Sequence, residues 1–167
     1  MRRTVVTDAG PLLVFSKLNV LHLLKALYGR VCFPVSVYQE TVAAGMRRGF
    51  ADAHTLRLFL KQHHWNPQSV DELTADLRAI HLDRGEKESI FLALKENAML
   101  LMDEERGRVE ARERGLRVKG SLGVLIEAYR KDFINTDQLR LYFGQIAERP
   151  DIWISPVLCS RVLDQIL

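Results

Sequence analysis

Short hydrophobic runs, several of them rich in β-branched residues, recur along the chain and end at turn-forming or charged residues. Runs of this length and composition are typical of buried strands in a parallel sheet. The predicted strands cover residues 5–7, 31–33, 99–102 and 116–118, and residues 153–154 are considered as a late edge strand. The pattern therefore predicts a sheet of about four to five short strands.

Between these runs, hydrophobic residues recur every three to four positions, which is the spacing of amphipathic helices. The predicted helices cover residues 12–28 (with a break near residue 18), 34–43, 56–60, 73–80, 84–97, 104–114, 121–131 and 136–148. Strands that alternate with helices are joined by right-handed crossovers, which place helices on both faces of a parallel sheet. We therefore expect a three-layer α/β/α fold.

The alternation of strands and helices stops after residue 134. Residues 1–134 are accordingly predicted to form an α/β domain, and residues 135–167 a helical C-terminal extension that packs on the same domain. Within residues 1–134, the least certain division is at residues 45–49, a basic segment flanked by glycines that we expect to form a flexible hinge before the middle helices.

Composition narrows the class of protein without naming a function. A chain of 167 residues with 47% hydrophobic and 27% charged residues fits one globular domain and excludes fibrous and disordered classes. A net charge of +3 permits a nucleic-acid partner but does not require one. Cys32 and Cys159 form no CxxC motif, which favours two reduced, buried thiols. Since no hydrophobic run approaches the roughly 18 residues of a membrane span, we expect a cytoplasmic protein without membrane contact.

Carboxylates follow two of the predicted strands. Asp8 comes directly after the strand at 5–7, and Asp103 and Glu104 come directly after the strand at 99–102. If these strands are neighbours, their carboxyl ends place the acids at one edge of the sheet, where open α/β sheets bind ligands. Crowded carboxylates repel one another unless a cation neutralises them, and oxygen ligands without sulfur suit Mg²⁺ or Mn²⁺. Such ions support phosphodiester hydrolysis.

Each of these acids also has a simpler explanation. Asp8 precedes a Gly-Pro turn into a helix and is well suited to be its N-cap. The acids after residue 102 would favourably charge a helix N-terminus. Glu40, Glu86 and Glu88 could be solvated residues on helix faces, and the hydrophobic stripe of the helix at 84–97 leaves Glu86 and Glu88 on opposite flanks. Periodicity alone therefore does not choose between a site and a set of ordinary surface acids.

Four ordered segments resemble the PIN-domain family, and within it the stand-alone prokaryotic proteins related to VapC-type toxins. They are VVTDAGPLLVFSKL, VCFPVSVYQETV, LDRGEKESIFLALKENAMLLMDEERGR and RVKGSLGVLIEAYRKDFI, and together they span about residues 4–134. The resemblance implies a central parallel sheet flanked by helices, an acidic pocket that binds Mg²⁺ or Mn²⁺, and ribonuclease activity toward single-stranded RNA.

The same resemblance implies a set of site residues. The implied catalytic residues are Asp8, Glu40, Glu88, Asp103 and Glu104, and the implied metal ligands are Asp8, Glu86, Glu88 and Asp103. Two positions depart from the family pattern, because Met102 replaces a hydroxyl residue and Glu104 stands where an aspartate is usual. For Ser121, which relatives often match with a small hydroxyl residue near the pocket, we favour a role as a helix cap.

Arginines supply the predicted contacts to RNA phosphates. Arg106 and Arg108 lie closest in sequence to the acids, and Arg47 and Arg48 form a second candidate rim, although ion pairs on an exposed helix explain such charges as well.

An antitoxin protein is a further expected partner. A homodimer is expected through hydrophobic residues of the early helices, namely Leu13, Val14, Leu21, Leu24 and Leu27. The alternative to a nuclease is a PIN-fold module that binds nucleic acid or protein without turnover.

Overall fold

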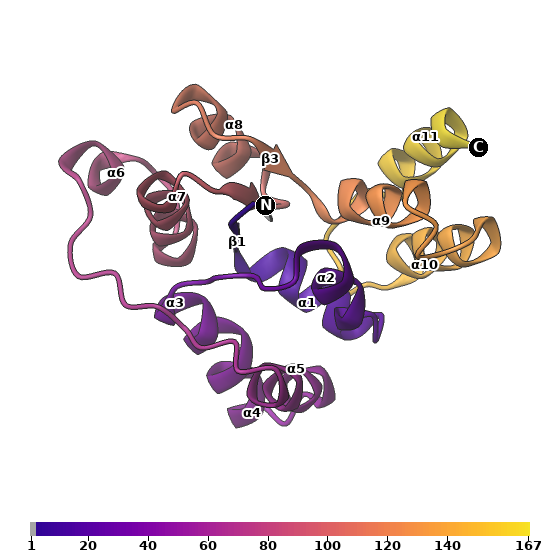
Figure 1. The fold of residues 1–167 in the computed structure, drawn as a ribbon, viewed down its shortest axis with the longest axis horizontal. Coiled ribbons are helices and arrows are strands. Elements are labelled where there is room, and N and C mark those ends of the chain that lie inside the picture. The colour runs from indigo at the N-terminus through magenta and orange to yellow at the C-terminus, as the bar shows by residue number, and fades with distance from the viewer. Residues whose placement is uncertain (1–2) are drawn as a thin grey trace.

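The centre of the molecule is a small parallel sheet (Figure 1). The structure is a computed structural model and describes residues 3–167, so residues 1 and 2 of the predicted domain lie outside it. The strands are β1 (Val5–Thr7), β2 (Met99–Leu101) and β3 (Val118–Lys119), in the order β1-β2-β3. Val6 pairs with Leu100, and Leu100 pairs with Val118, so the hydrophobic runs far apart in sequence are in register.

The predicted number of strands is wrong, because the described residues form three and not four to five. Residues 31–33 make only an isolated parallel bridge, in which Cys32 N donates to Val5 O and Thr7 N donates to Cys32 O. This segment lies beside β1 as an extended edge, but Pro34 follows at once and has no backbone N–H to continue a ladder. Residues 153–154 form no strand, and Trp153 is 95% exposed.

Helices make up most of the described chain. In chain order they are α1 (Ala9–Lys17), α2 (Leu21–Tyr28), α3 (Val35–Tyr38), the π-helix η1 (Gln39–Ala43), α4 (Ala44–Arg47), α5 (Ala51–Gln62), α6 (Ala75–Ala79), α7 (Arg84–Glu96), α8 (Glu105–Glu113), α9 (Ser121–Arg130), α10 (Thr136–Glu148) and α11 (Pro156–Ile166). These agree with most of the predicted helices, while α11 occupies a region for which the sequence indicated only a helical extension.

The two faces of the sheet are covered by different helices, which confirms the α/β arrangement with a parallel sheet. Val5 and Leu101 point into a core shared with α1, α2 and α9. Val6 and Leu100 point to the opposite face, into a second core with α7 and α8. This division follows from the period of two along a strand, because neighbouring residues point to opposite faces.

Helices α10 and α11 pack beside α9 at one side of the molecule (Figure 1). Leu139, Phe143 and Ile146 of α10 are buried in the same core as Leu12 and Leu24 of the first helices. Helix α10 begins with a capping box, in which the Asn135 side chain accepts from Gln138 N and the Gln138 side chain accepts from Asn135 N. The extension therefore shares its core with the residues before 134, and a domain boundary at that residue remains a prediction.

Three of the five residues on which the predicted homodimer depends are buried within the chain. Val14, Leu21 and Leu24 are at most 5% exposed, because α1 and α2 bury them in the core of the chain itself. They are therefore not surplus hydrophobic surface. Among the helices described here, none is long and hydrophobic enough to cross a membrane.

Candidate functional site

The carboxyl ends of β1 and β2 place Asp8 and Asp103 next to the first turn of α1. Asp8 N donates to Leu101 O at 2.9 Å, which fixes the end of β1 against the end of β2. A methyl group added at Gly10 would lie 3.3 Å from Asp103 Oδ2, so the start of α1 needs a glycine to pass this carboxylate. The two acids that follow neighbouring strands therefore lie at one edge of the sheet, as the strand pattern predicts.

Asp8 is buried and incompletely hydrogen-bonded. It stands at the N-cap position of α1, but its side chain makes no capping hydrogen bond, and Oδ1 is buried without a partner among the described residues. Burial raises the pKa of Asp8 to about 7, with further increases from the charges of Asp83, Glu40 and Asp103. Capping of α1 therefore does not explain this residue.

The start of α7 adds two carboxylates, Asp83 and Glu86. Asp83 caps the helix, because its Oδ1 accepts from Glu86 N at 2.8 Å. Glu86 is buried, and its Oε2 has no partner among the described residues. Burial raises the pKa of Glu86, and the neighbouring Asp83, Asp8 and Glu104 raise it further. Sequence reasoning missed Asp83, although an aspartate three residues before the glutamate at a helix start is a recognisable capping signal.

Glu40 approaches the same region from the π-helix η1. A methyl group at Gly85 would lie 3.1 Å from Glu40 Oε2 and 3.6 Å from Asp83 Oδ1, which places Glu40 against the first turn of α7. Partial desolvation and the charge of Asp83 raise the pKa of Glu40. Wide π turns inside helices occur frequently at functional sites.

Ser121 holds Asp103 in place. Asp103 Oδ1 accepts from Ser121 N at 2.7 Å, and Asp103 Oδ2 accepts from Ser121 Oγ at 2.6 Å. The preference for Ser121 as a helix cap is therefore wrong, because Gly120 occupies the N-cap position of α9 and the hydroxyl bonds to the acid. Burial raises the pKa of Asp103, while Ser121 and the nearby Arg108 work in the opposite direction.

Two of the predicted acids have partners of their own. Glu88 is buried and pairs with Arg84 at 3.0 Å. Glu104 caps α8, because its Oε2 accepts from Gly107 N at 2.6 Å. Met102 lies in the core, so the hydroxyl beside Asp103 comes from Ser121.

The predicted phosphate-contacting arginines differ in exposure. Arg106, Arg47 and Arg48 are exposed, whereas Arg108 is half-buried and its Nε has no partner among the described residues. A methyl group at Gly120 would clash with Arg108 Nη1 and lie 3.0 Å from Asp103 Oδ1. Of the four arginines, Arg108 is thus the one that the structure places directly beside an acid.

Within residues 3–167, no three His, Cys, Asp or Glu side chains already form a group that could hold a metal ion. The chemistry of the carboxylates nevertheless fits a divalent cation. Asp8 Oδ1 and Glu86 Oε2 are buried oxygens with no donor among residues 3–167, and burial raises the pKa of both carboxyl groups. A hard cation such as Mg²⁺ or Mn²⁺ takes oxygen ligands of this kind and would relieve the repulsion.

Comparison with known proteins agrees with this geometry. A family model described as a PIN domain matches residues 4–166, which extends beyond the four resembling segments into α10 and α11. No curated protein matches the chain. Because the family model covers nearly the whole sequence, the chain belongs to the PIN-domain family.

Proposed function

We propose that the protein is a metal-dependent ribonuclease whose active site lies at the carboxyl ends of β1 and β2. PIN domains in general have a nuclease-type fold and depend on divalent metal ions. The observation that carries the proposal for this chain is Asp8, which is buried with an unpartnered oxygen and faces the charges of three further acids. A structural acid in that position would be expected to have a cap or an ion-pair partner.

The ligands that we assign are Asp8, Glu86 and Asp103. We prefer Glu86 to Glu88, because Glu86 faces Asp8 and has an unpartnered oxygen, whereas Glu88 pairs with Arg84. A bound Mg²⁺ or Mn²⁺ would supply Lewis-acid activation of water and of the scissile phosphate.

The remaining site residues would position the substrate and handle protons. Ser121 keeps Asp103 in one orientation through its two hydrogen bonds. Burial and the charge of Asp83 raise the pKa of Glu40, which makes it a stronger base than an ordinary glutamate, and Glu104 lies near Glu86 as a second candidate base. Arg108 and Arg106 would contact RNA phosphates from α8, and Arg47 and Arg48 would contact them from α4.

The test is cleavage of single-stranded and structured RNAs with Mn²⁺ or with chelator, for wild type, Asp8→Asn, Glu86→Gln and the control Glu105→Gln. We expect cleavage only with metal, and losses of at least about 100-fold in the first two variants. Glu105 is exposed, so its variant should cleave normally. Calorimetric titration should detect no Mn²⁺ binding in the same two variants.

Metal-independent cleavage, or equal activity in all variants, would contradict the proposal. Binding of RNA or protein without cleavage would support the non-catalytic alternative.

The choice between the two neighbouring glutamates has its own test. Glu88→Gln should retain Mn²⁺ binding, because the structure already gives Glu88 an ion-pair partner. If Glu88→Gln abolishes Mn²⁺ binding while Glu86→Gln does not, Glu88 is the ligand and the assignment above is wrong.

The antitoxin and the substrate class rest on the resemblance to VapC-type toxins, whereas the homodimer rests on the early helices, where Leu13 and Leu27 are partly exposed. We propose single-stranded RNA as the substrate class, an antitoxin as a protein partner, a cytoplasmic location and a homodimer. Growth arrest on expression of wild type, but not of Asp8→Asn, would support a toxin role. Sedimentation at about 10 µM would test the homodimer, because a specific dimer is expected to persist at that concentration.

A further inference from the structure

A second polar pocket lies between the sheet and helices α2 and α9. Its lining includes Arg3 and Arg117, which precede strands, and Lys119 at the end of β3. It has a volume of about 460 Å³, and its charged lining comes from Arg3, Arg117, Lys119, Lys131 and Glu127. Arg3 precedes β1 and Arg117 precedes β3, whereas Asp8 and Asp103 follow the opposite ends of β1 and β2. Because β1 spans three residues, the two regions are separated by about 10 Å of strand.

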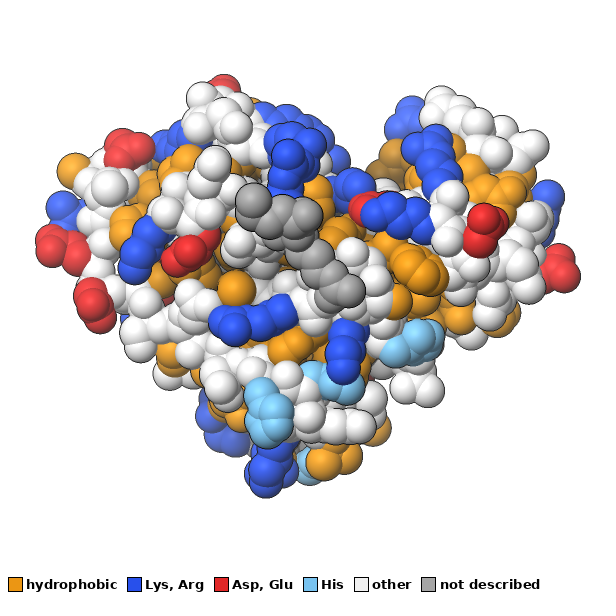
Figure 2. Space-filling view, in the orientation of Figure 1, with side chains coloured by type: hydrophobic (Ala, Val, Ile, Leu, Met, Phe, Trp, Pro, Cys, Tyr) orange, Lys and Arg blue, Asp and Glu red, His pale blue; other side chains and the backbone are white. Residues whose placement is uncertain are grey.

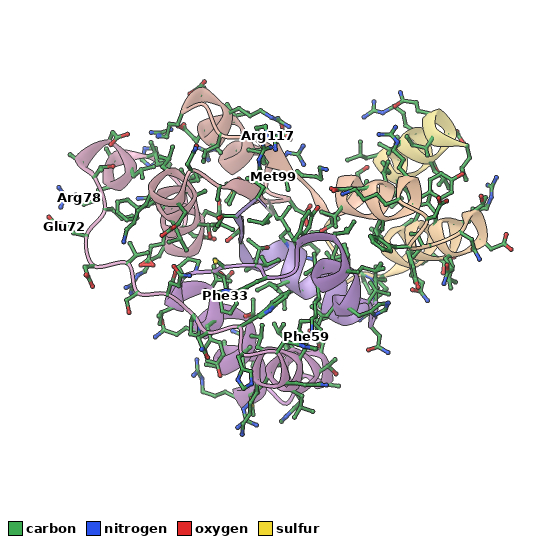
Figure 3. The ribbon with its side chains drawn as sticks, viewed as in Figure 1. Phe33, Phe59, Glu72, Arg78, Met99 and Arg117 are labelled. Atoms are coloured by element: carbon green, nitrogen blue, oxygen red, sulfur yellow. The ribbon has the colours of Figure 1, made fainter. Side chains whose placement is uncertain are left out.

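The molecule is hollowed on the face that Figure 2 shows. Figure 2 shows a notch between the part of the molecule built from α8 and β3 and the part built from α9 to α11, with Lys and Arg side chains on its borders. Figure 3 shows Arg117 close to Met99 near the start of β1, and both residues line the pocket.

The charge of the pocket is strongly positive. Four cationic side chains face a single carboxylate, Glu127. Neither Arg3 nor Arg117 has an ion-pair or hydrogen-bond partner for its guanidinium in the part of the chain that the structure describes. A guanidinium presents five N–H donors in a fixed fork that matches phosphate oxygens. Two such groups are therefore free to bind an anion.

Glu127 organises the other side of the pocket. Its Oε2 accepts from Lys119 Nζ at 2.5 Å and from Tyr28 Oη at 2.8 Å, and its Oε1 accepts from Lys131 Nζ at 3.1 Å. These donors keep the pKa of Glu127 low, so it remains ionised and holds both ammonium groups in place. Each ammonium has three N–H groups, so donors remain after the contact with Glu127.

One wall of the pocket is hydrophobic. Val5, Leu27 and Met99 line it, together with the buried ring of Tyr28. A pocket of a few hundred Å³ that joins a hydrophobic wall to a few convergent polar groups is typical of a small-molecule site. Cations opposite a hydrophobic wall match a ligand with a phosphate at one end and a ring at the other.

We propose that this pocket binds a nucleotide through its phosphate, with Arg3, Arg117 and the two lysines around the anion and the sugar or base against the hydrophobic wall. The nucleotide is either free or one unit of an RNA strand, since both present the same phosphate and ring. The proposal rests on the charges and shape of this pocket and holds whether or not the carboxylates cleave RNA.

The test measures binding of adenosine 5′-monophosphate, adenosine and a short single-stranded RNA to the full chain in chelator, which removes divalent ions and so prevents metal-dependent cleavage. The pocket variant carries both Arg3→Gln and Arg117→Gln. The control variant carries both Arg57→Gln and Arg140→Gln, which remove two exposed arginines on α5 and α10. We expect the pocket variant to lose about tenfold or more in affinity, because charge-assisted hydrogen bonds are removed, and the control to bind as wild type does.

The outcomes separate the two sources of the nucleotide. Binding of the monophosphate but not of adenosine, weakened only in the pocket variant, identifies a free nucleotide. Loss of RNA affinity only in the pocket variant, without binding of the monophosphate, identifies an RNA strand. If the pocket variant and the control bind every ligand equally, the proposal is overturned. The experiment measures binding in chelator and not metal-dependent cleavage, so failure of the nuclease proposal would leave this result unchanged.

Discussion

At the scale of single residues, the carboxylates of the site are distinguished by the partners that they lack. Asp8 and Glu86 are buried, and each has one oxygen without a partner in the described part of the chain. Glu88 and Glu104 instead have an arginine and a helix N-terminus as partners. Unpaired buried charge destabilises a folded chain, so a site of this kind persists only where function requires it. The free-energy cost of burying the Asp8 carboxylate can therefore be measured from the stability of a variant that lacks the charge.

Asp8→Asn is expected to stabilise the metal-free protein at pH 8 by about 2–4 kcal/mol and to have little effect near pH 4. The ordinary pKa of 3.8 applies in the unfolded chain, and burial raises the pKa to about 7 in the folded one. As pH rises between these values the unfolded chain releases its proton first, so folding stability falls across that interval. Urea unfolding in chelator at both pH values measures the difference.

The control for this prediction is Asp137→Asn, because Asp137 is exposed on α10 and its substitution should change the free energy of unfolding by no more than about 0.5 kcal/mol. Saturating Mn²⁺ should raise the stability of wild type but not of Asp8→Asn, because only a bound ion shifts the folding equilibrium. A destabilised Asp8→Asn at pH 8 would indicate a structural role for Asp8.

Ser121→Ala is expected to destabilise the protein by about 1–3 kcal/mol and to weaken Mn²⁺ binding, because Asp103 loses a charge-assisted hydrogen bond. The matched control is Ser89→Ala, which removes a buried hydroxyl that has no partner among the described residues. Chemical unfolding and calorimetric Mn²⁺ titration measure both effects. Equal behaviour of the two variants would argue against a positioning role for Ser121.

At the scale of helices and strands, close packing decides where the site residues lie. The helical segment that the sequence predicts at 34–43 continues through α3, η1 and α4, and it widens into a π turn at the residues around Glu40. Glycines allow two close approaches next to this segment, Gly85 beside Glu40 and Gly45 beside Ala53 of α5. The position of η1, and with it Glu40, therefore depends on how α4 packs on α5.

Gly45→Ala is expected to destabilise the protein by about 1–3 kcal/mol, because the added methyl would lie 2.6 Å from Ala53 Cβ and force α4 away from α5. Gly144→Ala is the matched control within α10, where the added methyl meets nothing within 4 Å. That variant should gain about 0.5–1 kcal/mol from helix propensity. Thermal unfolding followed by circular dichroism compares the two, and a neutral Gly45→Ala would contradict the packing argument.

At the scale of the whole molecule, one hydrophobic core joins the two ends of the chain. Phe143 of α10 and Leu12 of α1 belong to the same buried cluster, and Ile152 and Cys159 extend it to α11. The helices after residue 134 therefore contribute to the stability of the part of the chain that carries the carboxylates. This favours unfolding as one cooperative unit.

Phe143→Ala is expected to destabilise the entire molecule by about 3–5 kcal/mol in a single transition, because Phe143 is 1% exposed. Leu141→Ala is the control on the same helix, where the side chain is 54% exposed and the change should be within about 0.5 kcal/mol. Tryptophan fluorescence and circular dichroism should give coincident urea transitions. Two separated transitions would instead show that residues 135–167 unfold as an independent domain.

The sequence by itself determined the class of the fold and most helix boundaries. The spacing of hydrophobic residues and the positions of turn residues are local features of the sequence. They suffice to predict the helix beginning at Arg84 and the strand at 5–7 without knowledge of the elements that pack against them. The order of the acids along the chain, and their positions after strands, also follow from local pattern. Asp8 and Asp103 could therefore be predicted to meet at one edge if their strands were neighbours, and the strand order β1-β2-β3 supplied that condition.

Only the tertiary structure decided which of these residues share a site. Residues 31–33 have the composition of a strand, yet their place beside β1 and the proline after them leave a single bridge. Glu86 and Glu88 are indistinguishable by period, and packing directs one toward Asp8 and the other toward Arg84. The hydrogen bonds of Asp83 to Glu86 and of Ser121 to Asp103 are seen only in the structure. Burial, charge proximity and hydrogen bonding join residues that are distant along the chain, and no local pattern encodes those distances.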